Sequence, residues 1–430
     1  MKILIKNGHV IDPANGRDEE LDILINDGVI AEVGKSIETD DFELEVIDAS
    51  GLTVTPGLVD MHVHLREPGF EYKEDIESGT RAAAAGGVTS VACMPNTSPA
   101  ADNAAVITYI KERAKEAGYA DVYPIGAVSK GLKGKELAEI GEMKFAGAAA
   151  ISDDGMPVTE SGLMRRAMEY SKMFDIKVIS HCEDFGLADG GYMNEGPTAT
   201  AMGLRGISRA AEEVMVSRDI IIAETIGAPV HIAHVSTRGS VELVRQAKAR
   251  GVKVTCETCP HYFSLTDKAC EGFNTNAKMN PPLRTDDDVA AIKEGLRDGT
   301  IDCIVTDHAP HHIDEKNCEF GHALNGIVGL ETSLGLGIKN LVNEGVLTLP
   351  QLIEKMSVNP SRVLGIPKGT LSAGAQADVT IFDPDKEWTV DISKFMSKSK
   401  NSPFDGEVLF GKPQYVVFCG ELVVNQGVMV

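Results

Sequence analysis

The stretch that decides the fold is GLVDMHVHLREPG, at residues 57–69. It is an apolar run that carries two histidines, His62 and His64, and then enters a charged turn at Arg66. Residues at i and i+2 of a β-strand point to the same face, so a strand over 58–65 places both imidazoles side by side. We interpret the run as a buried strand whose carboxyl end reaches a functional site.

Seven further apolar runs follow along the chain, and each ends in a polar turn. The eight runs lie at 58–65, 90–96, 121–128, 147–154, 176–184, 229–236, 252–261 and 301–310. Amphipathic helices are predicted between them, for example over 102–117, 161–174 and 240–251. Eight strand–helix units in about 310 residues are typical of a TIM (β/α)8 barrel. A doubly wound open sheet is the alternative, but no Gly-x-Gly-x-x-Gly motif follows the first strand.

Both ends of the chain differ in pattern from this middle part. Short strands broken by Asn-Gly and Asp-Gly turns are predicted before residue 55, and the chain after residue 368 has the same character. We expect the two ends to pair into one small β-sandwich domain. The predicted organisation is therefore an α/β chain with a barrel at 56–367 and a β-sandwich domain built from 1–55 and 368–430.

Composition excludes several classes of function. The 430 residues are 43% hydrophobic and 24% charged, as in a folded protein with a large core. A net charge of −23 argues against a nucleic-acid-binding surface. Neither a signal peptide nor an apolar stretch of about 18 residues is found. Eight scattered cysteines are typical of reduced thiols, so we expect a cytoplasmic protein with no membrane or nucleic-acid partner.

Polar residues gather where the predicted strands end. They are His62 and His64 on the first strand, Asp153 and Asp154 on the fourth, His181 on the fifth, His234 on the sixth, and Asp307 and His308 on the eighth. The carboxyl ends of barrel strands open on one face, where active sites form. Four histidines with one or two carboxylates can bind divalent metals, and two ions that share a bridging carboxylate would use the whole set. Spacing alone leaves both Asp153 and Asp154 open as the bridge.

Two such ions would indicate a class of reaction. Zinc lowers the pKa of bound water toward about 7, and a hydroxide that bridges two ions is a nucleophile at neutral pH. Asp307 lies at the mouth end of the last strand and is the candidate general acid/base, which takes the nucleophile's proton and delivers it to a leaving nitrogen. The sequence therefore predicts hydrolysis of an unactivated amide, or the reverse condensation.

Further polar residues are candidates for binding the substrate. Arg66 is suited to a bidentate contact with a carboxylate. Its alternative partners are the neighbouring acids Glu67, Glu71 and Asp75. Asn96 and Asn280 follow the second and seventh strands, and His311 lies four residues beyond the predicted acid/base. An Asn in a Pro-containing turn commonly serves the turn itself, so this structural interpretation stays open for both.

The remaining histidines and one cysteine pair have plainer interpretations. His231 shares a strand with His234, but its odd spacing places it on the other face. His261 follows the seventh strand and is a candidate for supporting the site from behind. We take the others, His9, His312 and His322, as surface or loop residues. The Cys256-x-x-Cys259 spacing fits a metal or redox site, but no second pair follows, so ordinary strand residues are preferred.

The motifs taken together resemble a known family. They are DMHVHLREPG, GTRAAAAGGVTSVACMPNT, ISDDG, SHCED, AHVST, MNPPLR and TDHAPH. Over essentially its whole length the chain is similar to the bacterial class I dihydroorotases, cyclic amidohydrolases of the third step of de novo pyrimidine (UMP) biosynthesis. The resemblance implies a TIM barrel, two zinc ions per subunit, and reversible cyclisation of N-carbamoyl-L-aspartate to (S)-dihydroorotate plus water.

The resemblance also implies roles for single residues. One zinc would be held by His62, His64 and Asp307, and the other by His181 and His234. The bridge would be Asp154, where many relatives have a carboxylated lysine, and Asp307 would be the general acid/base. The implied substrate contacts are His64, Arg66, Asn96, Asn280, His311, Asn325 and Gly326.

Two alternatives remain for the function. Another cyclic amidohydrolase, an allantoinase or a dihydropyrimidinase, is the nearest, but both usually carry the bridging lysine that GAAAISDDG lacks. A non-catalytic scaffold for aspartate carbamoyltransferase is the other, although scaffolds tend to lose metal ligands. The resemblance also suggests two assemblies, a homodimer and an association with aspartate carbamoyltransferase. The polar segment 311–322 is either a mobile lid or a rigid loop.

Overall fold

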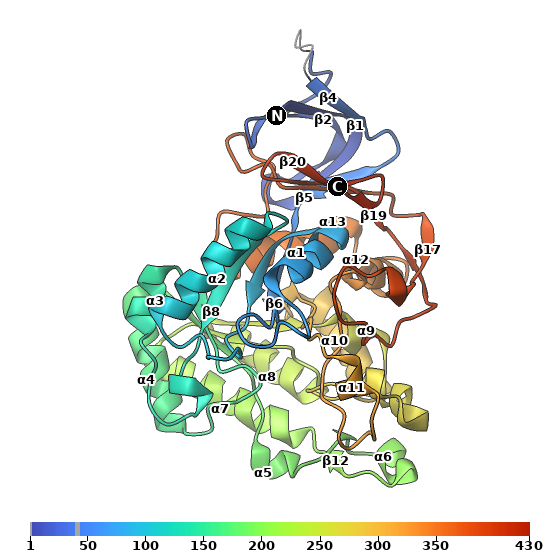
Figure 1. Ribbon diagram of the computed structural model, residues 1–430. Coiled ribbons are helices and arrows are strands. Elements are labelled where there is room, and N and C mark those ends of the chain that lie inside the picture. Colours follow the sequence, from blue (N-terminus) through green and yellow to red (C-terminus); the bar gives the residue numbers. More distant parts are fainter. Residues whose placement is uncertain (1, 39–43) are drawn as a thin grey trace.

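The computed structural model describes residues 2–38 and 44–430, and it consists of a barrel beneath a sheet built from both ends of the chain (Figure 1). The barrel strands are β6 (Leu58–Val63), β7 (Val88–Cys93), β8 (Asp121–Gly126), β9 (Ala150–Ile151), β10 (Lys177–Ser180), β13 (Val230–Ile232), β14 (Val254–Thr258) and β15 (Cys303–Ile304). They pair in chain order, all parallel. Seven of them lie within the predicted runs, and β7 begins two residues before its run at 90–96, so the predicted TIM barrel is confirmed.

The barrel nearly closes between its first and last strands. The backbone N–H of His64 donates to the carbonyl of His308 at 2.8 Å, and the N–H of Thr306 donates to the Asp60 carboxylate. Every residue of β6 and β7 is buried. Parallel strands that are buried on both faces have continuous apolar sequences. For this reason the apolar runs in the sequence predicted the barrel strands.

Helices surround the barrel and follow its strands (Figure 1). They are α1 (Ile76–Ala85), α2 (Ala104–Ala117), α3 (Ile140–Ala146), α4 (Ser161–Ser171), α7 (Ala210–Ile226), α8 (Arg238–Ala249), α10 (Asp286–Arg297), α12 (Ser333–Gly337), α13 (Leu349–Ile353) and α14 (Asn359–Leu364). Side-chain caps define several starts: Asp75 accepts from the N–H of Ser78 in α1, and Thr237 accepts from that of Ser240 in α8. The helices predicted within 102–117, 161–174 and 240–251 correspond to α2, α4 and α8.

Both ends of the chain share one nine-stranded sheet. Its strands are β1 (Lys2–Asp12), β2 (Arg17–Asn26), β3 (Val29–Gly34), β4 (Leu44–Asp48), β5 (Thr53–Pro56), β16 (Val379–Phe382), β19 (Pro413–Phe418), β20 (Glu421–Asn425) and β21 (Val428–Met429). Strand β5 lies between β1 and β16, so it joins the amino-terminal strands to the carboxyl-terminal ones. The predicted pairing of the two ends is therefore confirmed, while the domain boundaries stay a prediction.

Smaller elements lie in the connections. They are α5 (Phe185–Ala188), β11 (Met193–Asn194), α6 (Pro197–Met202), β12 (Gly206–Ile207), α9 (Pro260–Ser264), α11 (Ile313–Lys316), β17 (Glu387–Thr389) and β18 (Val408–Phe410). No helix within the described ranges is both long and apolar enough to span a membrane. All eight cysteines are free thiols, and six of them are buried.

Candidate functional site

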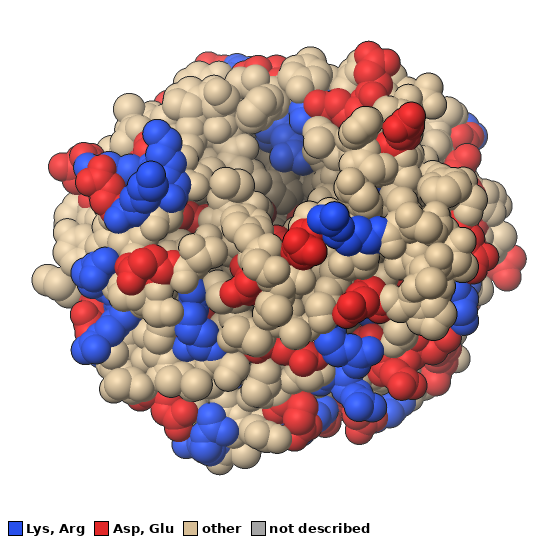
Figure 2. All heavy atoms as spheres, turned by 90° about the horizontal axis from the view of Figure 1, so that it is seen from below, with Lys and Arg blue, Asp and Glu red and all other residues tan. Residues whose placement is uncertain are grey.

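The carboxyl ends of the barrel strands open on the face turned away from the terminal sheet. This follows because only Gly57 separates β5, in that sheet, from β6. Figure 2 looks onto the molecule from this side and shows a hollow with Lys or Arg atoms in its wall. On a protein of net charge −23, such a cationic wall is a local feature suited to an anionic ligand.

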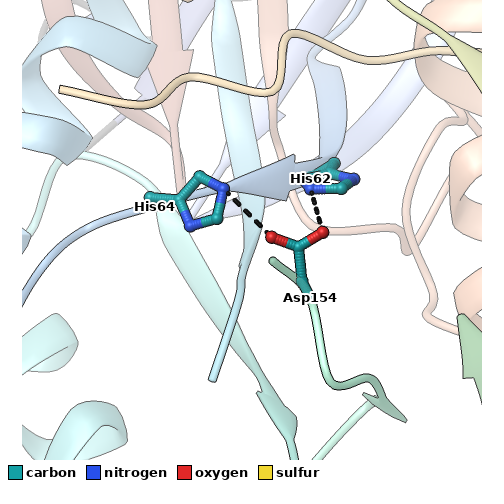
Figure 3. A group of neighbouring side chains, drawn as sticks. All are labelled: His62, His64 and Asp154. Atoms are coloured by element: carbon teal, nitrogen blue, oxygen red, sulfur yellow. Dashed lines mark ion pairs between the residues drawn. The ribbon is translucent and has the colours of Figure 1, made fainter. Parts of the chain in front are cut away.

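His62 and His64 reach the barrel mouth from the end of β6. Figure 3 shows both rings beside the carboxylate of Asp154. His62 Nε2 lies 3.3 Å from Asp154 Oδ1, and His64 Nε2 lies 3.4 Å from Asp154 Oδ2. Both histidines are buried. Two imidazoles from one strand thus meet one carboxylate from another.

The adjacent acids after β9 lie in different surroundings. Asp153 accepts hydrogen bonds from the backbone N–H groups of Val128 and Ser129 at 2.7 and 3.0 Å, and another from the Ser129 hydroxyl. Asp154 instead faces the histidines of the mouth. The geometry therefore favours Asp154 over Asp153 as a shared ligand, a choice that spacing alone left open.

His181 and His234 form a second group around the same carboxylate. They follow β10 and β13, and their Nδ1 and Nε2 atoms lie 3.4 and 3.5 Å from Asp154 Oδ1. The two ring nitrogens are 2.8 Å apart. Two sets of three ligand atoms result, each with its atoms within 4.8 Å of one another, and both sets contain Asp154.

Asp307 follows β15 and lies beside the first group. Its Oδ1 atom is 3.1 Å from His64 Nε2 and 3.6 Å from His62 Nε2. Its backbone has φ of +48°, and those of His234 and Arg66 have φ of +32° and +62°. Non-glycine residues seldom adopt this region, and they do so mainly where the surroundings impose it, as at active sites.

Two atoms of the cluster are buried without a hydrogen-bond partner, His62 Nε2 and Asp154 Oδ1. Buried polar atoms are nearly always paired in proteins, so unpaired ones that face each other indicate room for a ligand between them. Imidazole nitrogen and carboxylate oxygen are the donors that bind zinc and related divalent metals. The described residues can therefore hold metal.

The charges of the cluster stabilise one another strongly. Burial disfavours the ionised carboxylate of Asp154, but the attraction of His62 and the contacts with His181 and His234 hold its pKa well below the ordinary value. Burial likewise opposes a charge on His62, but Asp154 and Glu257 raise its pKa well above the ordinary value. Such a site favours a bound cation, which would replace the protons on the imidazoles.

Arg66 lies next to the cluster and has no acidic partner among residues 2–38 and 44–430. Its Nε donates to the carbonyl of Pro310 at 3.1 Å, and its Nη2 lies 3.5 Å from His311 Nε2. Burial lowers the pKa of Arg66 to about 10, so the guanidinium stays charged at neutral pH. The neighbouring Glu67 pairs with Arg113 instead, at 2.9 Å. The salt-bridge alternative for Arg66 is therefore wrong.

His311 connects this arginine to the loop after β15. Its Nε2 lies 2.7 Å from the carbonyl of Asn325, and its Nδ1 lies 3.5 Å from Lys73 Nζ. Burial, together with the charges of Arg66 and Lys73, lowers the pKa of His311, so the ring is neutral. A neutral ring that donates from Nε2 to Asn325 offers its Nδ1 lone pair to the lysine.

The two predicted asparagines lie beside the ligand candidates, one in direct contact and one through a glutamate. Asn96 Oδ1 lies 2.9 Å from His64 Nδ1, and its Nδ2 donates to the Asp154 carbonyl at 3.5 Å. Asn280 Nδ2 donates to Glu183 Oε2 at 3.0 Å, and that oxygen also lies 3.4 Å from His181 Nε2. Each asparagine is therefore connected to an imidazole, directly or through one acid.

The segment 311–322 is anchored rather than open. The Nζ atom of Lys316 donates to the carbonyls of Lys278, Leu324 and Gly326. Lys278 Nζ donates in turn to the carbonyls of Phe320 and Ala323 at 2.6 and 2.7 Å. The buried amino groups of Lys278 and Lys316 thus hold the loop that presents Gly326, which supports the rigid-loop interpretation.

The remaining sequence candidates lie apart from the two ligand sets. His9 and His322 are exposed, His312 is half-buried, and all three pair with nearby acids. Cys256 lies in β14 and Cys259 directly follows it; both are buried free thiols, and burial raises the pKa of both. His261 is buried with no partner for its Nε2, and burial lowers its pKa to about 4.

Two glutamates at the site were missed by reasoning from the sequence, Glu183 and Glu257. Glu183 contacts His181, and Glu257 contacts both His62 and His231. The available signal was an acid within or just after a buried apolar run. Such an acid is costly unless a specific partner holds it, and the partners here come from distant parts of the chain.

Comparison with known proteins gives a consistent picture. A family model described as dihydro-orotase-like matches residues 51–240. The chain is 63% identical to a dihydroorotase of Acetivibrio thermocellus, over 99% of this chain and 100% of that one. It is 62% identical to a dihydroorotase of Ruminiclostridium cellulolyticum over the full length of both chains.

Solved structures share the fold. An L-hydantoinase (dihydropyrimidinase) from Arthrobacter aurescens superimposes with a TM-score of 0.88 over 100% of this chain and 97% of that one, at 29% sequence identity. A D-hydantoinase (dihydropyrimidinase) from Thermus sp. gives a TM-score of 0.85 at 25% identity, over 100% of this chain and 96% of that one.

Proposed function

The chain belongs to the dihydroorotase family of cyclic amide hydrolases, and from that premise we propose that it interconverts N-carbamoyl-L-aspartate and (S)-dihydroorotate with two zinc ions. In the hydrolytic direction the ring amide C–N bond breaks and a C–O bond to water forms. In the reverse direction the carboxylate and the ureido nitrogen close the ring and release water. This is the third step of de novo pyrimidine (UMP) biosynthesis.

One observation carries the proposal, namely that Asp154 belongs to both sets of potential metal ligands. The residues fit a metal pair, because His62 Nε2 and Asp154 Oδ1 are buried, face each other at 3.3 Å, and have no hydrogen-bond partner. His62, His64 and Asp307 would hold one ion, His181 and His234 the other, and Asp154 both. When bound, a divalent pair supplies Lewis acidity that activates water and polarises a carbonyl group.

The side chains beside the ligands would bind and orient the substrate carboxylate. Arg66 is charged, unpaired by any described acid, and next to His311. A guanidinium matches a carboxylate with two parallel hydrogen bonds. Asn96, Asn280 and the backbone at Asn325 and Gly326 would complete the contacts, with His64 close to the reacting group. This arrangement favours an acidic cyclic amide over a neutral one.

Asp307 would move the proton. Its Oδ1 atom lies 3.1 Å from His64 Nε2, so the carboxylate is held at the reaction centre. Burial favours its protonated form, but the contact with His64 and the charge of His62 hold its pKa below the ordinary value, so it is ionised and can accept a proton. It would take the proton from the attacking water and return it to the leaving amide nitrogen.

Location and assembly follow from the proposed role. We place the protein in the cytoplasm, in agreement with its free thiols. A homodimer and an association with aspartate carbamoyltransferase stay predictions. The alternative of a dihydropyrimidinase is supported by likeness of fold, at 29% identity or less, whereas the dihydroorotases match at about 60%.

The decisive experiment measures both directions of the reaction on purified protein. We expect cyclisation of N-carbamoyl-L-aspartate at acidic pH and hydrolysis of dihydroorotate at alkaline pH, because cyclisation consumes a proton. Both should be lost with a chelator and restored by zinc. Metal-loaded protein that turns over dihydrouracil or hydantoin but not dihydroorotate would instead support the other amidohydrolases. Metal-loaded protein inert toward all of them would support the scaffold.

A further inference from the structure

Glu257 is a fully buried carboxylate near the carboxyl end of β14. Three groups approach it within hydrogen-bonding range. His62 Nδ1 lies 2.6 Å from its Oε1 atom, His231 Nε2 lies 3.1 Å from its Oε2 atom, and the backbone N–H of His234 donates to Oε1 at 3.4 Å. The first barrel strand, β6, and the segment after β13 are not adjacent in the barrel, yet this one side chain links them.

The contact with His62 determines which nitrogen of that ring carries a proton. A buried carboxylate accepts hydrogen bonds, so Nδ1 must be the protonated nitrogen. When a metal ion replaces the proton on Nε2, this atom presents a lone pair, and it is the atom that faces Asp154 at 3.3 Å. Histidines that ligate metals commonly donate their other N–H to a carboxylate, which fixes the ring and its tautomer.

The contact with His234 acts on the backbone. His234 has φ of +32°, a conformation that costs a non-glycine residue free energy and that needs support from its surroundings. Its N–H donates to the same Glu257 oxygen that binds the His62 ring. The other oxygen is held by His231, whose Nδ1 lies 2.8 Å from Thr255 Oγ1. Glu257 is thereby fixed from both sides.

We propose that Glu257 is a positioning residue that couples the two metal sites, because it orients the ring of His62 at one and the backbone of His234 at the other. The inference rests on the proposed function, since it presupposes the metal pair. It also gives His231 a role: this histidine is not a ligand candidate, but it secures the carboxylate that aligns two of them.

The test is a metal titration that does not depend on turnover. Metal-free wild-type protein and Glu257→Gln are titrated with Zn²⁺ against a competing chelator, and with Co²⁺ while the visible spectrum is recorded. We expect Glu257→Gln to lower the affinity for at least one ion by about 10- to 100-fold and to change the cobalt spectrum. Glutamine keeps the size of the side chain but can donate to His62 Nδ1, which favours the wrong tautomer.

Two further variants keep the result interpretable. Asp12→Asn neutralises another fully buried carboxylate, in the terminal sheet, and should leave both metal affinities unchanged. Glu257→Asp retains the charge with a shorter reach, and should fall between wild type and Glu257→Gln. If Glu257→Gln does not fold, as judged by circular dichroism, Glu257→Asp decides the question alone.

The outcomes separate this inference from the proposed function. One outcome is that the wild type binds two ions and every folded Glu257 variant keeps the wild-type affinities and cobalt spectrum. This outcome overturns the positioning role and leaves the proposed function intact. Wild type that binds no ion pair overturns both. Equal losses in Asp12→Asn and Glu257→Gln would show a general effect of removing buried charge, and would also overturn the positioning role.

Discussion

Asp153 and Asp154 are adjacent in the chain, yet one carboxylate binds the backbone after β8 while the other lies within 3.5 Å of four histidines. We expect Asp154→Asn to bind fewer than two metal ions per chain and to lose at least about 100-fold in kcat, because an amide is a much weaker ligand than a shared carboxylate. Elemental analysis after gel filtration, with steady-state kinetics, measures both.

Asp153→Asn is the matched control for that variant. Its amide oxygen can still accept from the N–H groups of Val128 and Ser129, so metal content should stay near that of wild type. We expect only a stability loss of about 1 kcal/mol from the weaker hydrogen bonds. If Asp153→Asn lost the metal and Asp154→Asn kept it, the two roles would have to be exchanged.

Asp307→Asn should abolish most of the turnover in both directions. General acid–base catalysis contributes about 100- to 10,000-fold, and an amide cannot accept the proton. Metal content is measured in the same sample, because the variant also removes a proposed ligand. A variant that kept a tenth of the wild-type rate would rule out Asp307 as the acid/base.

Arg66→Gln should raise KM for N-carbamoyl-L-aspartate and for dihydroorotate by at least about 10-fold, because the substrate carboxylate loses a bidentate charged partner. Arg66→Lys should restore only part of the affinity, since an ammonium cannot form the same fork. Arg113→Gln is the control: Arg113 binds the adjacent Glu67 but is separate from the mouth. A rise of KM in Arg113→Gln equal to that in Arg66→Gln would indicate a structural effect.

Glu331 is not one of the proposed metal ligands, and its burial should make the stability of the protein depend on pH. Burial raises its pKa to about 7, against the hydrogen bonds from the N–H groups of Met396 and Ser397. Between about pH 4.5 and 7 the folded state then binds more protons than the unfolded state, so this residue's contribution to stability falls as pH rises. The Tm of Glu331→Gln relative to wild type should therefore be higher at pH 8 than at pH 5. An unchanged difference would contradict the assignment.

The fold was accessible from the sequence because its signals are local. Each barrel strand is a buried run of apolar residues, and the polar residues at its end, such as His181 after β10, follow directly in the chain. The positions of β4 and β5 in the terminal sheet were harder to predict from the sequence. Both pair with β1 in parallel, and parallel pairing leaves no turn signal between neighbours.

The supporting contacts of the site depend on residues far apart in the chain. His62 and Glu257 are 195 residues apart, and His64 and Asp307 are 243 residues apart. Spacing gives the direction of a side chain on its own strand, but it does not show which neighbour that side chain meets. For this reason the choice between Asp153 and Asp154, and the contacts of Glu183 and Glu257, needed the structure.

The sheet shared by the two ends has a consequence for synthesis of the protein. Strand β5, which leads into the strand of His62, pairs on one side with β16, and β16 is made roughly 320 residues later. At about 5–20 residues per second, a ribosome needs tens of seconds to supply that partner. During this time the edge of β5 is open, and an open edge can accept a strand from another chain. Transcripts truncated before residue 379 should therefore yield aggregating products, even though they encode every proposed metal ligand.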